Sequence, residues 1–238
     1  MLYLMGLGLN DEKDLTLRAI ETAKKCDCFI ELYTSVWKGS LENLKKMIGK
    51  NIEVLKRIDL EEKLDLFIEK AKNKDIALFV PGDPLAATTH IDIVYDAKRK
   101  KIPVKIIHNA SIFSAIGETG LQMYKYGKVA TIPLSGKLSN VKDAIHTNKK
   151  LGLHTLLLLD LDIENNIIMK VADALNMLLN KKIIRETDQL IAFSKAGGDS
   201  KIYYDSARGL KLKNIESPAV LIIPGRMHFR EKDFLEVI

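Results

Sequence analysis

Short apolar runs alternate with amphipathic segments along the first 108 residues of the chain. In the helix predicted over 41–48, the apolar side chains Leu41, Leu44 and Ile48 share one face, which indicates packing against a core. Alternation of strands and helices is typical of a parallel α/β sheet. We expect strands at 2–5, 28–33, 52–55, 76–80 and 104–107 and helices at 14–25, 41–48, 60–71 and 91–98.

The second half of the chain has a different pattern, in which several strands follow one another without a helix between them. Such a pattern favours a mixed sheet with antiparallel pairs. We therefore predict two α/β domains, an N-terminal domain at 1–108 with a parallel sheet and a C-terminal domain at 109–238 with a mixed sheet. The second domain is expected to have strands at 128–132, 155–161, 189–194, 202–204 and 219–223 and helices at 140–149 and 168–179.

Composition excludes several other classes of protein. Apolar runs such as 156–159 and 219–223 are too short to span a bilayer, and the first residues lack the basic and cleavable features of a secretory signal, so a cytoplasmic location is expected. The net charge of +6 permits nucleic-acid contact, yet the lysines are scattered beside acids, and no direct nucleic-acid binding is expected. Cys26 and Cys28 provide neither a disulfide framework nor a zinc site, and no metal is expected.

Glycines follow the first predicted strand in Gly6-Leu7-Gly8. A dinucleotide-binding loop would need a third glycine, but Asp11 stands there, and Asp11, Glu12 and Asp14 give the next helix the wrong charge for phosphate. We therefore reject a pyrophosphate site. The glycines are better suited to close approach by a small uncharged or cationic ligand.

The stretch from Pro81 to His90 comes directly after the strand at 76–80. Pro81 and Pro84 restrict the backbone around Gly82 and Asp83, so the loop is predicted to be rigid. Ligands of open α/β sheets bind beyond the carboxyl ends of the strands, which gives Asp83 a binding role by position. After the strand at 104–107, Ser111 is placed to cap a helix that begins at Ile112.

Four segments together resemble the class III, tetrapyrrole-methylase-type, S-adenosylmethionine-dependent methyltransferases. They are Tyr3 to Leu9, Pro81 to His90, Asn109 to Gly117, and Gly152 through Thr155 to Asp160. Within this family, the Thr88-Thr89-His90 continuation, the 118–127 stretch and Gly152-Leu153-His154-Thr155 are similar to the branch that acts in diphthamide synthesis.

The resemblance implies two α/β domains with S-adenosylmethionine bound in the cleft between them, usually in a homodimer. It also implies methylation of the amino group on the modified histidine of translation elongation factor 2, with S-adenosylhomocysteine as the second product. Carried over position by position, the cofactor contacts are Leu9, Asp83, Ala86, Ser111, Ile112, Leu159, Ala196, Gly197 and Val220.

Catalytic side chains are not identified by the sequence. The attacking amine must lose a proton, and a nearby carboxylate would oppose that loss, so we expect Asp83 to serve the cofactor. His90, His108 and His228 lie near strand ends, where a structural, hydrogen-bonded histidine is the simpler interpretation.

Two alternatives stay open at this point. The chain could be a class III methyltransferase that acts on a tetrapyrrole or ribosomal RNA, or a non-catalytic module that binds a nucleotide or RNA. The segment Pro133 to Leu138 is shorter than in family members and lacks their aromatic residues, which leaves recognition of the protein substrate undefined.

Overall fold

The computed structural model describes residues 1–238, and the chain divides into two compact units. Unit 1 is Met1–Phe113 and unit 2 is Ser114–Ile238. The sequence placed the division after residue 108, whereas the contacts of the loop after the last strand of unit 1 keep residues 109–113 with that unit.

Unit 1 is built on a five-stranded sheet in which every neighbouring pair is parallel. The order across the sheet is β3-β2-β4-β1-β5, so the first strand lies between the fourth and the fifth. The strands are β1 Leu2–Gly6, β2 Asp27–Glu31, β3 Ile52–Leu55, β4 Ile76–Val80 and β5 Val104–Ile107. Strand β4 is buried along its whole length, as expected of a strand covered on both faces.

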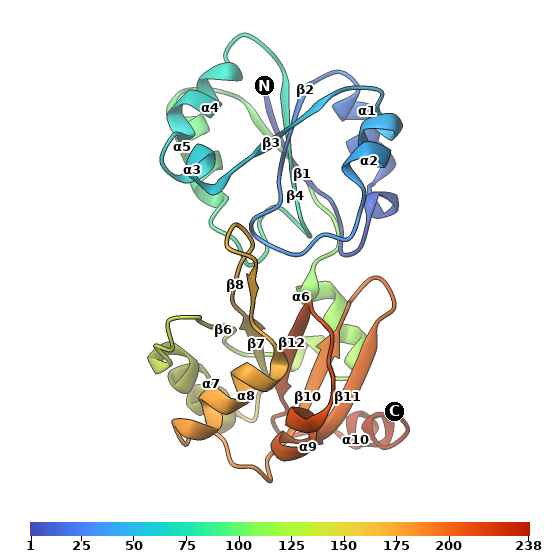
Figure 1. The fold of residues 1–238 in the computed structure, drawn as a ribbon, viewed down its shortest axis with the longest axis vertical. Helices are drawn as coiled ribbons and strands as arrows, with labels where there is room; N and C mark the ends of the chain where they lie inside the picture. The colour runs from blue at the N-terminus through green and yellow to red at the C-terminus, as the bar shows by residue number, and fades with distance from the viewer. The chain divides into compact units, whose positions relative to one another are not determined.

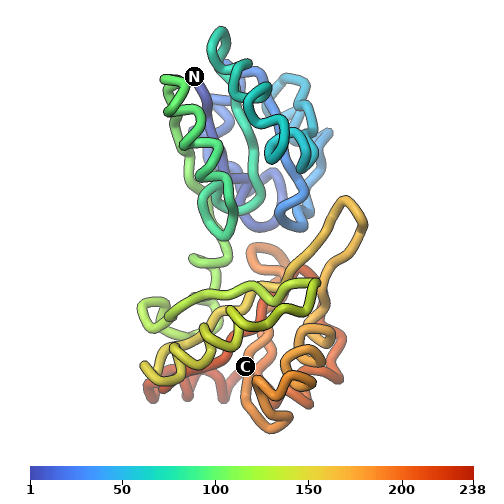
Figure 2. The backbone as a smooth tube through the Cα atoms, turned by 90° about the vertical axis from the view of Figure 1, so that its left-hand side faces the viewer, coloured from blue at the N-terminus to red at the C-terminus, as the bar shows by residue number.

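Helices cover both faces of this sheet (Figures 1 and 2). Side chains of α1 and α2 pack with Phe79 in one cluster, and those of α3, α4 and α5 pack with Leu78 in the other. The helices are α1 Leu17–Ala23, α2 Leu41–Ile48, α3 Arg57–Glu61, α4 Leu64–Lys70 and α5 Ile91–Arg99, with a 3-10 turn, η1, at Glu12–Asp14. Two separate apolar clusters therefore cover the two faces of the sheet, and the loops lie at the ends of its strands.

Unit 2 is built on a mixed sheet with the order β11-β10-β12-β7-β6. β6 and β7 are parallel, and the other neighbouring pairs are antiparallel. The strands are β6 Ala130–Ile132, β7 Thr155–Leu159, β10 Gln189–Ser194, β11 Lys201–Ser206 and β12 Ala219–Ile223; β8 Leu161–Asp162 and β9 Ile167–Ile168 form a separate hairpin. The predicted pairing of a parallel and a mixed sheet is confirmed.

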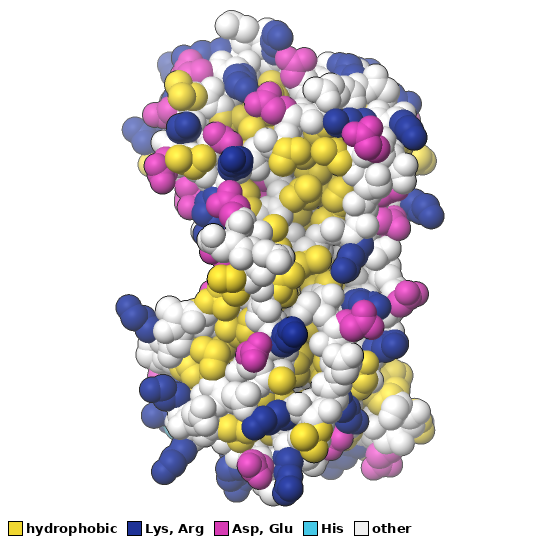
Figure 3. Space-filling view, in the orientation of Figure 1, with side chains coloured by type: hydrophobic (Ala, Val, Ile, Leu, Met, Phe, Trp, Pro, Cys, Tyr) yellow, Lys and Arg dark blue, Asp and Glu magenta, His cyan; other side chains and the backbone are white.

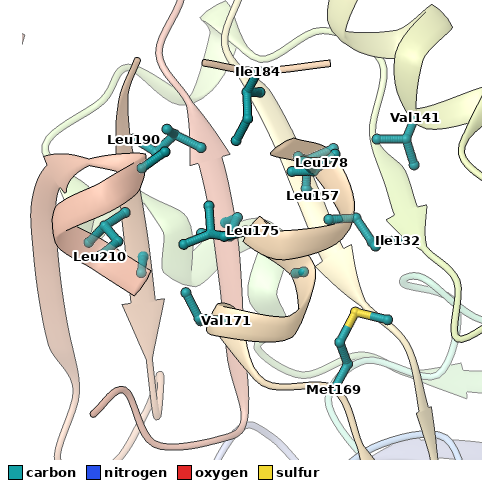
Figure 4. Close-up of a cluster of buried hydrophobic side chains, with 14 of the residues drawn as sticks. Ile132, Val141, Leu157, Met169, Val171, Leu175, Leu178, Ile184, Leu190 and Leu210 are labelled. Carbon is teal, nitrogen blue, oxygen red and sulfur yellow. The ribbon is translucent and has the colours of Figure 1, made fainter. Parts of the chain in front are cut away.

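Three helices, α7, α8 and α9, pack on one face of the mixed sheet around Leu157, Leu175 and Leu210 (Figure 4). The segment with η2 and η3 and the last helix belong to the same unit, and η2 contacts β10. The elements are α6 Ile112–Ala115, η2 Ile116–Thr119, η3 Met123–Lys125, α7 Ser139–Leu151, α8 Val171–Asn180, α9 Ala207–Leu212 and α10 Phe229–Leu235.

Three differences from the predicted elements stand out, and two of them have local causes. The helix expected over 60–71 is two helices: α3 begins where Asp59 accepts a hydrogen bond from the Lys56 amide, and it ends where the Lys63 amide donates to the Ile58 carbonyl oxygen, one residue before α4. The strand expected over 155–161 stops at Leu159, because the carboxylate of Asp160 accepts bonds from the amides of Leu134 and Leu161. The short helices α9 and α10 were not predicted.

Candidate functional site

Three loops meet at the carboxyl edge of the parallel sheet of unit 1. They follow β1, β4 and β5, which are neighbours in the sheet. The amide of Gly8 donates to the carbonyl oxygen of Gly82 at 3.1 Å, and the Gly82 amide donates to the Gly8 carbonyl oxygen at 2.8 Å. This pair of bonds continues the contact between β1 and β4 into the loops and fixes them to each other.

Gly6, the last residue of β1, lies under the contact between the other two loops. A Cβ atom at Gly6 would lie 2.5 Å from the Gly82 carbonyl oxygen and 2.6 Å from Cβ of Asn109. The Asn109 side-chain amide donates to the carbonyl oxygens of Gly6 and Asp14 at 3.0 and 2.9 Å. Only glycine at position 6 lets all three loops approach this closely.

The acidic residues after the glycines support the loop. Asp14 Oδ2 accepts from the amides of Leu9 and Asn10 at 3.0 and 2.7 Å. Glu12 is buried and accepts from the Ser40 amide and the Asn43 side chain. Their negative charges and these bonds are consistent with the exclusion of a pyrophosphate site.

Asp83 joins two of the three loops. Its Oδ1 accepts from the Leu85 amide at 3.0 Å, and its Oδ2 accepts from the Asn109 amide at 3.1 Å and lies 2.7 Å from His108 Nδ1. The residue is only 9% exposed. A buried carboxylate with this many donors is held in one orientation.

His108, which the sequence placed near a strand end, contacts Asp83 at this edge. Its side chain is 68% exposed, while Nδ1 contacts Asp83. A carboxylate partner favours the proton on Nδ1, which leaves Nε2 with a free lone pair. Asp83 and His108 are 25 positions apart, and only the strand order, with β1 between β4 and β5, brings them together.

His90 serves the structure of the same loop. It is 3% exposed, its Nδ1 lies 2.8 Å from Thr88 Oγ1, and its Nε2 is 3.8 Å from Oε1 of the buried Glu31. Burial lowers the pKa of His90 to about 4 and raises the pKa of Glu31 to about 7. His228 caps α10 by accepting from the Arg230 amide. All three predicted structural histidines make a hydrogen bond, and the contacts of His90 and His228 are those of structural residues, whereas the structural role expected of His108 stays a prediction.

The predicted contact residues fall into two groups. Leu9, Asp83, Ala86 and Ser111 lie on the three loops of unit 1, and Ile112 is the first residue of α6; Ser111 is buried and directly precedes that helix. Leu159, Ala196, Gly197 and Val220 lie in unit 2 at one edge of the mixed sheet, where β7 and β10 end and β12 begins. Within unit 2, the bond from the Lys195 amide to the Pro218 carbonyl oxygen holds two of these segments together.

The carboxylates at the edge of unit 1 suit a ligand with positive charge. Asp83 provides a carboxylate, the acids of the first loop add to the negative potential, and no lysine or arginine lies on the loops at 6–10, 81–90 or 108–111. S-adenosylmethionine carries a sulfonium and an ammonium group, so these residues fit it. No group of three or more His, Cys, Asp or Glu side chains is arranged to hold a metal ion.

Known proteins match the chain over its full length. The family model of the tetrapyrrole (corrin/porphyrin) methylases matches residues 1–207. A diphthine synthase of Methanocaldococcus jannaschii is 40% identical over 253 residues, covering 100% of this chain and 98% of the relative. A diphthine synthase of Methanococcus maripaludis is 39% identical over 251 residues with the same coverage. A crystal structure of diphthine synthase superimposes with a TM-score of 0.93 at 34% identity, covering 100% of this chain and 95% of that chain.

The fold of two α/β units and the glycine-lined edge define a protein of the tetrapyrrole methylase class, and the chain belongs to that family. Within the family it belongs to the diphthine synthases. The resemblance that the sequence motifs indicated is thereby confirmed, and the alternatives of a tetrapyrrole, ribosomal RNA or non-catalytic role are not favoured.

Proposed function

We propose that this methyltransferase of diphthamide biosynthesis transfers methyl groups from S-adenosylmethionine to the amino group of the modified histidine of translation elongation factor 2. The observation that carries the proposal is the match to diphthine synthases along the whole chain, loops of the candidate site included. The same match supports elongation factor 2 as the protein partner.

The cofactor is proposed to contact the residues that the motifs identified. Asp83 is suited to a positively charged group of S-adenosylmethionine, because its carboxylate is fixed by the Leu85 and Asn109 amides. Leu9, Ala86 and Ser111 on the same three loops, and Ile112 at the start of α6, are further proposed contacts from unit 1. Leu159, Ala196, Gly197 and Val220 are proposed contacts from unit 2. S-adenosylmethionine supplies the electrophilic methyl carbon, so the protein's task is alignment and exclusion of water.

His108 is proposed to accept the proton that the amine releases. In each transfer a nitrogen–carbon bond forms, the carbon–sulfur bond breaks, and one proton leaves the nitrogen. His108 Nε2 is free because Nδ1 faces Asp83 at 2.7 Å, and a neutral imidazole does not oppose deprotonation of the amine as a carboxylate would. Asp83 holds the imidazole in place through its contact with Nδ1.

We also propose that the protein is a homodimer in the cytoplasm and does not bind nucleic acid directly. The face drawn in Figure 3 supports the last point, because basic and acidic side chains are interspersed on it and no basic stripe runs across it. No helix of the protein has the length and apolar character needed to cross a membrane.

The test is methyl transfer from radiolabelled S-adenosylmethionine. Elongation factor 2 is supplied in two forms, with and without the aminocarboxypropyl group on its target histidine, and ribosomal RNA and a tetrapyrrole are offered in parallel. Label only on the modified factor supports the proposal. Label on RNA or the tetrapyrrole, with none on the factor, contradicts it. Label on the factor would also show that the short segment Pro133 to Leu138 is sufficient for recognition.

A further inference from the structure

A cavity distinct from the proposed cofactor contacts of unit 2 opens at the opposite strand ends of the mixed sheet. Its volume is about 610 Å³, and Thr155, Gln189 and Ile223 line it. These residues are the first of β7, the first of β10 and the last of β12, whereas Leu159, Ala196 and Val220 lie at the opposite ends of the same strands or just beyond them. We propose that this cavity, the distal cavity, binds an organic anion with an apolar body.

The walls of the distal cavity are apolar. Ile145 and Ile184 are buried, and Leu153, Ile183 and Ile223 are partly buried beside them. The volume lies in the range of small-molecule sites, which are mostly lined by apolar side chains with a few polar groups. An apolar ligand body that packs against these walls would remove apolar surface from water, which favours binding.

Four cationic side chains surround the apolar walls. Lys142 and Lys149 lie seven residues apart on α7, so both project from the helix face that also carries Ile145. Lys182 and Arg226 belong to the segments after α8 and β12. None of the four forms an ion pair with a carboxylate of the chain; the ion pairs of unit 2 join other residues.

Acidic side chains are nearly absent from the same lining. The one carboxylate is Asp188, and it is bound by Arg185, whose Nη2 lies 2.8 Å from Asp188 Oδ1. The four cations therefore produce a positive potential over the opening that no lining carboxylate cancels. An anionic group at the opening would have several charge-assisted donors available.

The segment 224–227 that forms one wall is fixed before any ligand binds. The Gly225 amide donates to His154 Nδ1 at 2.9 Å, and the Arg226 amide donates to the Gly152 carbonyl oxygen at 2.9 Å. Lys125 Nζ donates to the Arg226 carbonyl oxygen at 2.7 Å. A wall held in this way loses little freedom on binding, which favours affinity.

The chemistry of the lining distinguishes among anions. A nucleic acid would need a longer cationic track and several aromatic surfaces for stacking, whereas Tyr204 and the imidazole of His146 are the aromatic side chains that line the cavity. A small inorganic anion would leave the isoleucine walls in water. An anion with an apolar body satisfies both parts of the lining. This inference rests on unit 2 alone and does not depend on the proposed methyl transfer.

The test uses 8-anilinonaphthalene-1-sulfonate, an apolar anion, with the whole folded chain. We expect saturable fluorescence enhancement with one site per chain, and affinity at least about tenfold weaker in the double variant Lys149→Glu/Arg226→Glu. The matched control is Lys211→Glu/Lys232→Glu, which reverses two exposed charges elsewhere in unit 2 and leaves affinity within about twofold.

A methyl NMR spectrum of the isoleucine-labelled protein locates the probe. Shifts of Ile145, Ile184 and Ile223, with those of Ile30 in unit 1 unchanged, would support the distal cavity. Absence of saturable binding, equal affinity in both double variants, or shifts confined to other isoleucines would overturn it. Cofactor binding is measured on the same samples, so failure of this site and failure of the methyltransferase proposal are distinguishable.

Discussion

His108 Nδ1 lies 2.7 Å from Asp83 Oδ2, across the end of the strand that separates their two loops. The contact orients the exposed imidazole and completes the bonds of the buried carboxylate. The pair places a fixed carboxylate beside an imidazole whose Nε2 faces no carboxylate, the arrangement on which the proposed roles of the two residues rest.

Replacement of His108 by alanine should lower the rate of methyl transfer far more than the affinity for the cofactor. Loss of a proton acceptor typically reduces rate by about 10²-fold or more, and added imidazole should restore part of it. The measurement is single-turnover methyl transfer with and without imidazole, alongside S-adenosylhomocysteine affinity. His146→Ala, an exposed histidine of α7, is the control. A rate unchanged in His108→Ala would remove His108 from the reaction.

Replacement of Asp83 by alanine should weaken binding of S-adenosylmethionine by about tenfold or more, the loss expected for a charge-assisted contact. The change also frees the Leu85 and Asn109 amides that hold the loops together. Isothermal titration calorimetry measures the affinity. Asp92→Asn, an exposed carboxylate in the first turn of α5, should bind as the parent does. Equal affinities for Asp83→Ala and the parent would contradict a cofactor role.

Gly6→Ala should destabilise unit 1 and separate the loops that carry Asp83 and His108. The new Cβ would meet the Gly82 carbonyl oxygen at 2.5 Å, a backbone atom that cannot rotate away, and overpacking of this kind costs about 1–3 kcal/mol. Gly117→Ala is the matched control, because its nearest neighbour is the flexible Met123 sulfur at 3.3 Å. Urea unfolding and cofactor titration should show a loss in Gly6→Ala and a much smaller change in Gly117→Ala. Similar behaviour of the two variants would argue against the close approach at Gly6.

Glu231 should stabilise unit 2 in a manner that depends on pH. It is 1% exposed and binds His154 Nε2 at 3.0 Å and the amides of Gln122 and His228. Burial by itself would raise the pKa of Glu231. Hydrogen bonds, of which the one from Lys125 has the largest effect, outweigh burial and lower this pKa to about 2 from its usual 4.5. The carboxylate therefore contributes its full stability above pH 4.5 and loses that contribution as pH falls toward 2.

Glu231→Gln should lose about 3 kcal/mol of unfolding free energy at pH 7, because it leaves Lys125 without its carboxylate partner. Burial also lowers the pKa of His154, so protonation of that histidine in the unfolded chain adds to acid sensitivity below pH 6.5 in both proteins. Urea unfolding at pH 7 and pH 3 should show a smaller difference between variant and parent at pH 3. The control is Glu236→Gln, an exposed position directly after α10, which should have the parent's unfolding free energy. A Glu231→Gln variant with the parent's unfolding free energy at pH 7 would contradict this role of Glu231.

Regular elements with strong local signals were predictable from sequence. The helix Leu41–Ile48 was predicted with its observed ends, because Ser40 caps its first turn and Gly49 adopts the left-handed conformation after its last. Strands such as Ile76–Val80 and Gln189–Ser194 also match their predicted bounds. Breaks such as that at Asp160 were not predictable, because they depend on bonds to amides distant in the chain, like that of Leu134.

The candidate site was predictable in its parts and not in its assembly. Asp83 stood out because two prolines and a glycine fix a loop after a buried strand. Its partner His108 carried no such signal, since the pairing depends on strand order and on the space that Gly6 leaves. The distal cavity could not be predicted from the sequence, because its four cationic side chains come from three separate segments.

The most direct test of the account is tandem mass spectrometry of the target peptide of elongation factor 2 after reaction with the protein and S-adenosylmethionine. We expect methylation on the amino nitrogen of the modified histidine, absent from factor that lacks the modification and strongly reduced with His108→Ala. Methyl groups elsewhere on the factor, or an unmethylated peptide from a protein that binds the cofactor normally, would contradict it.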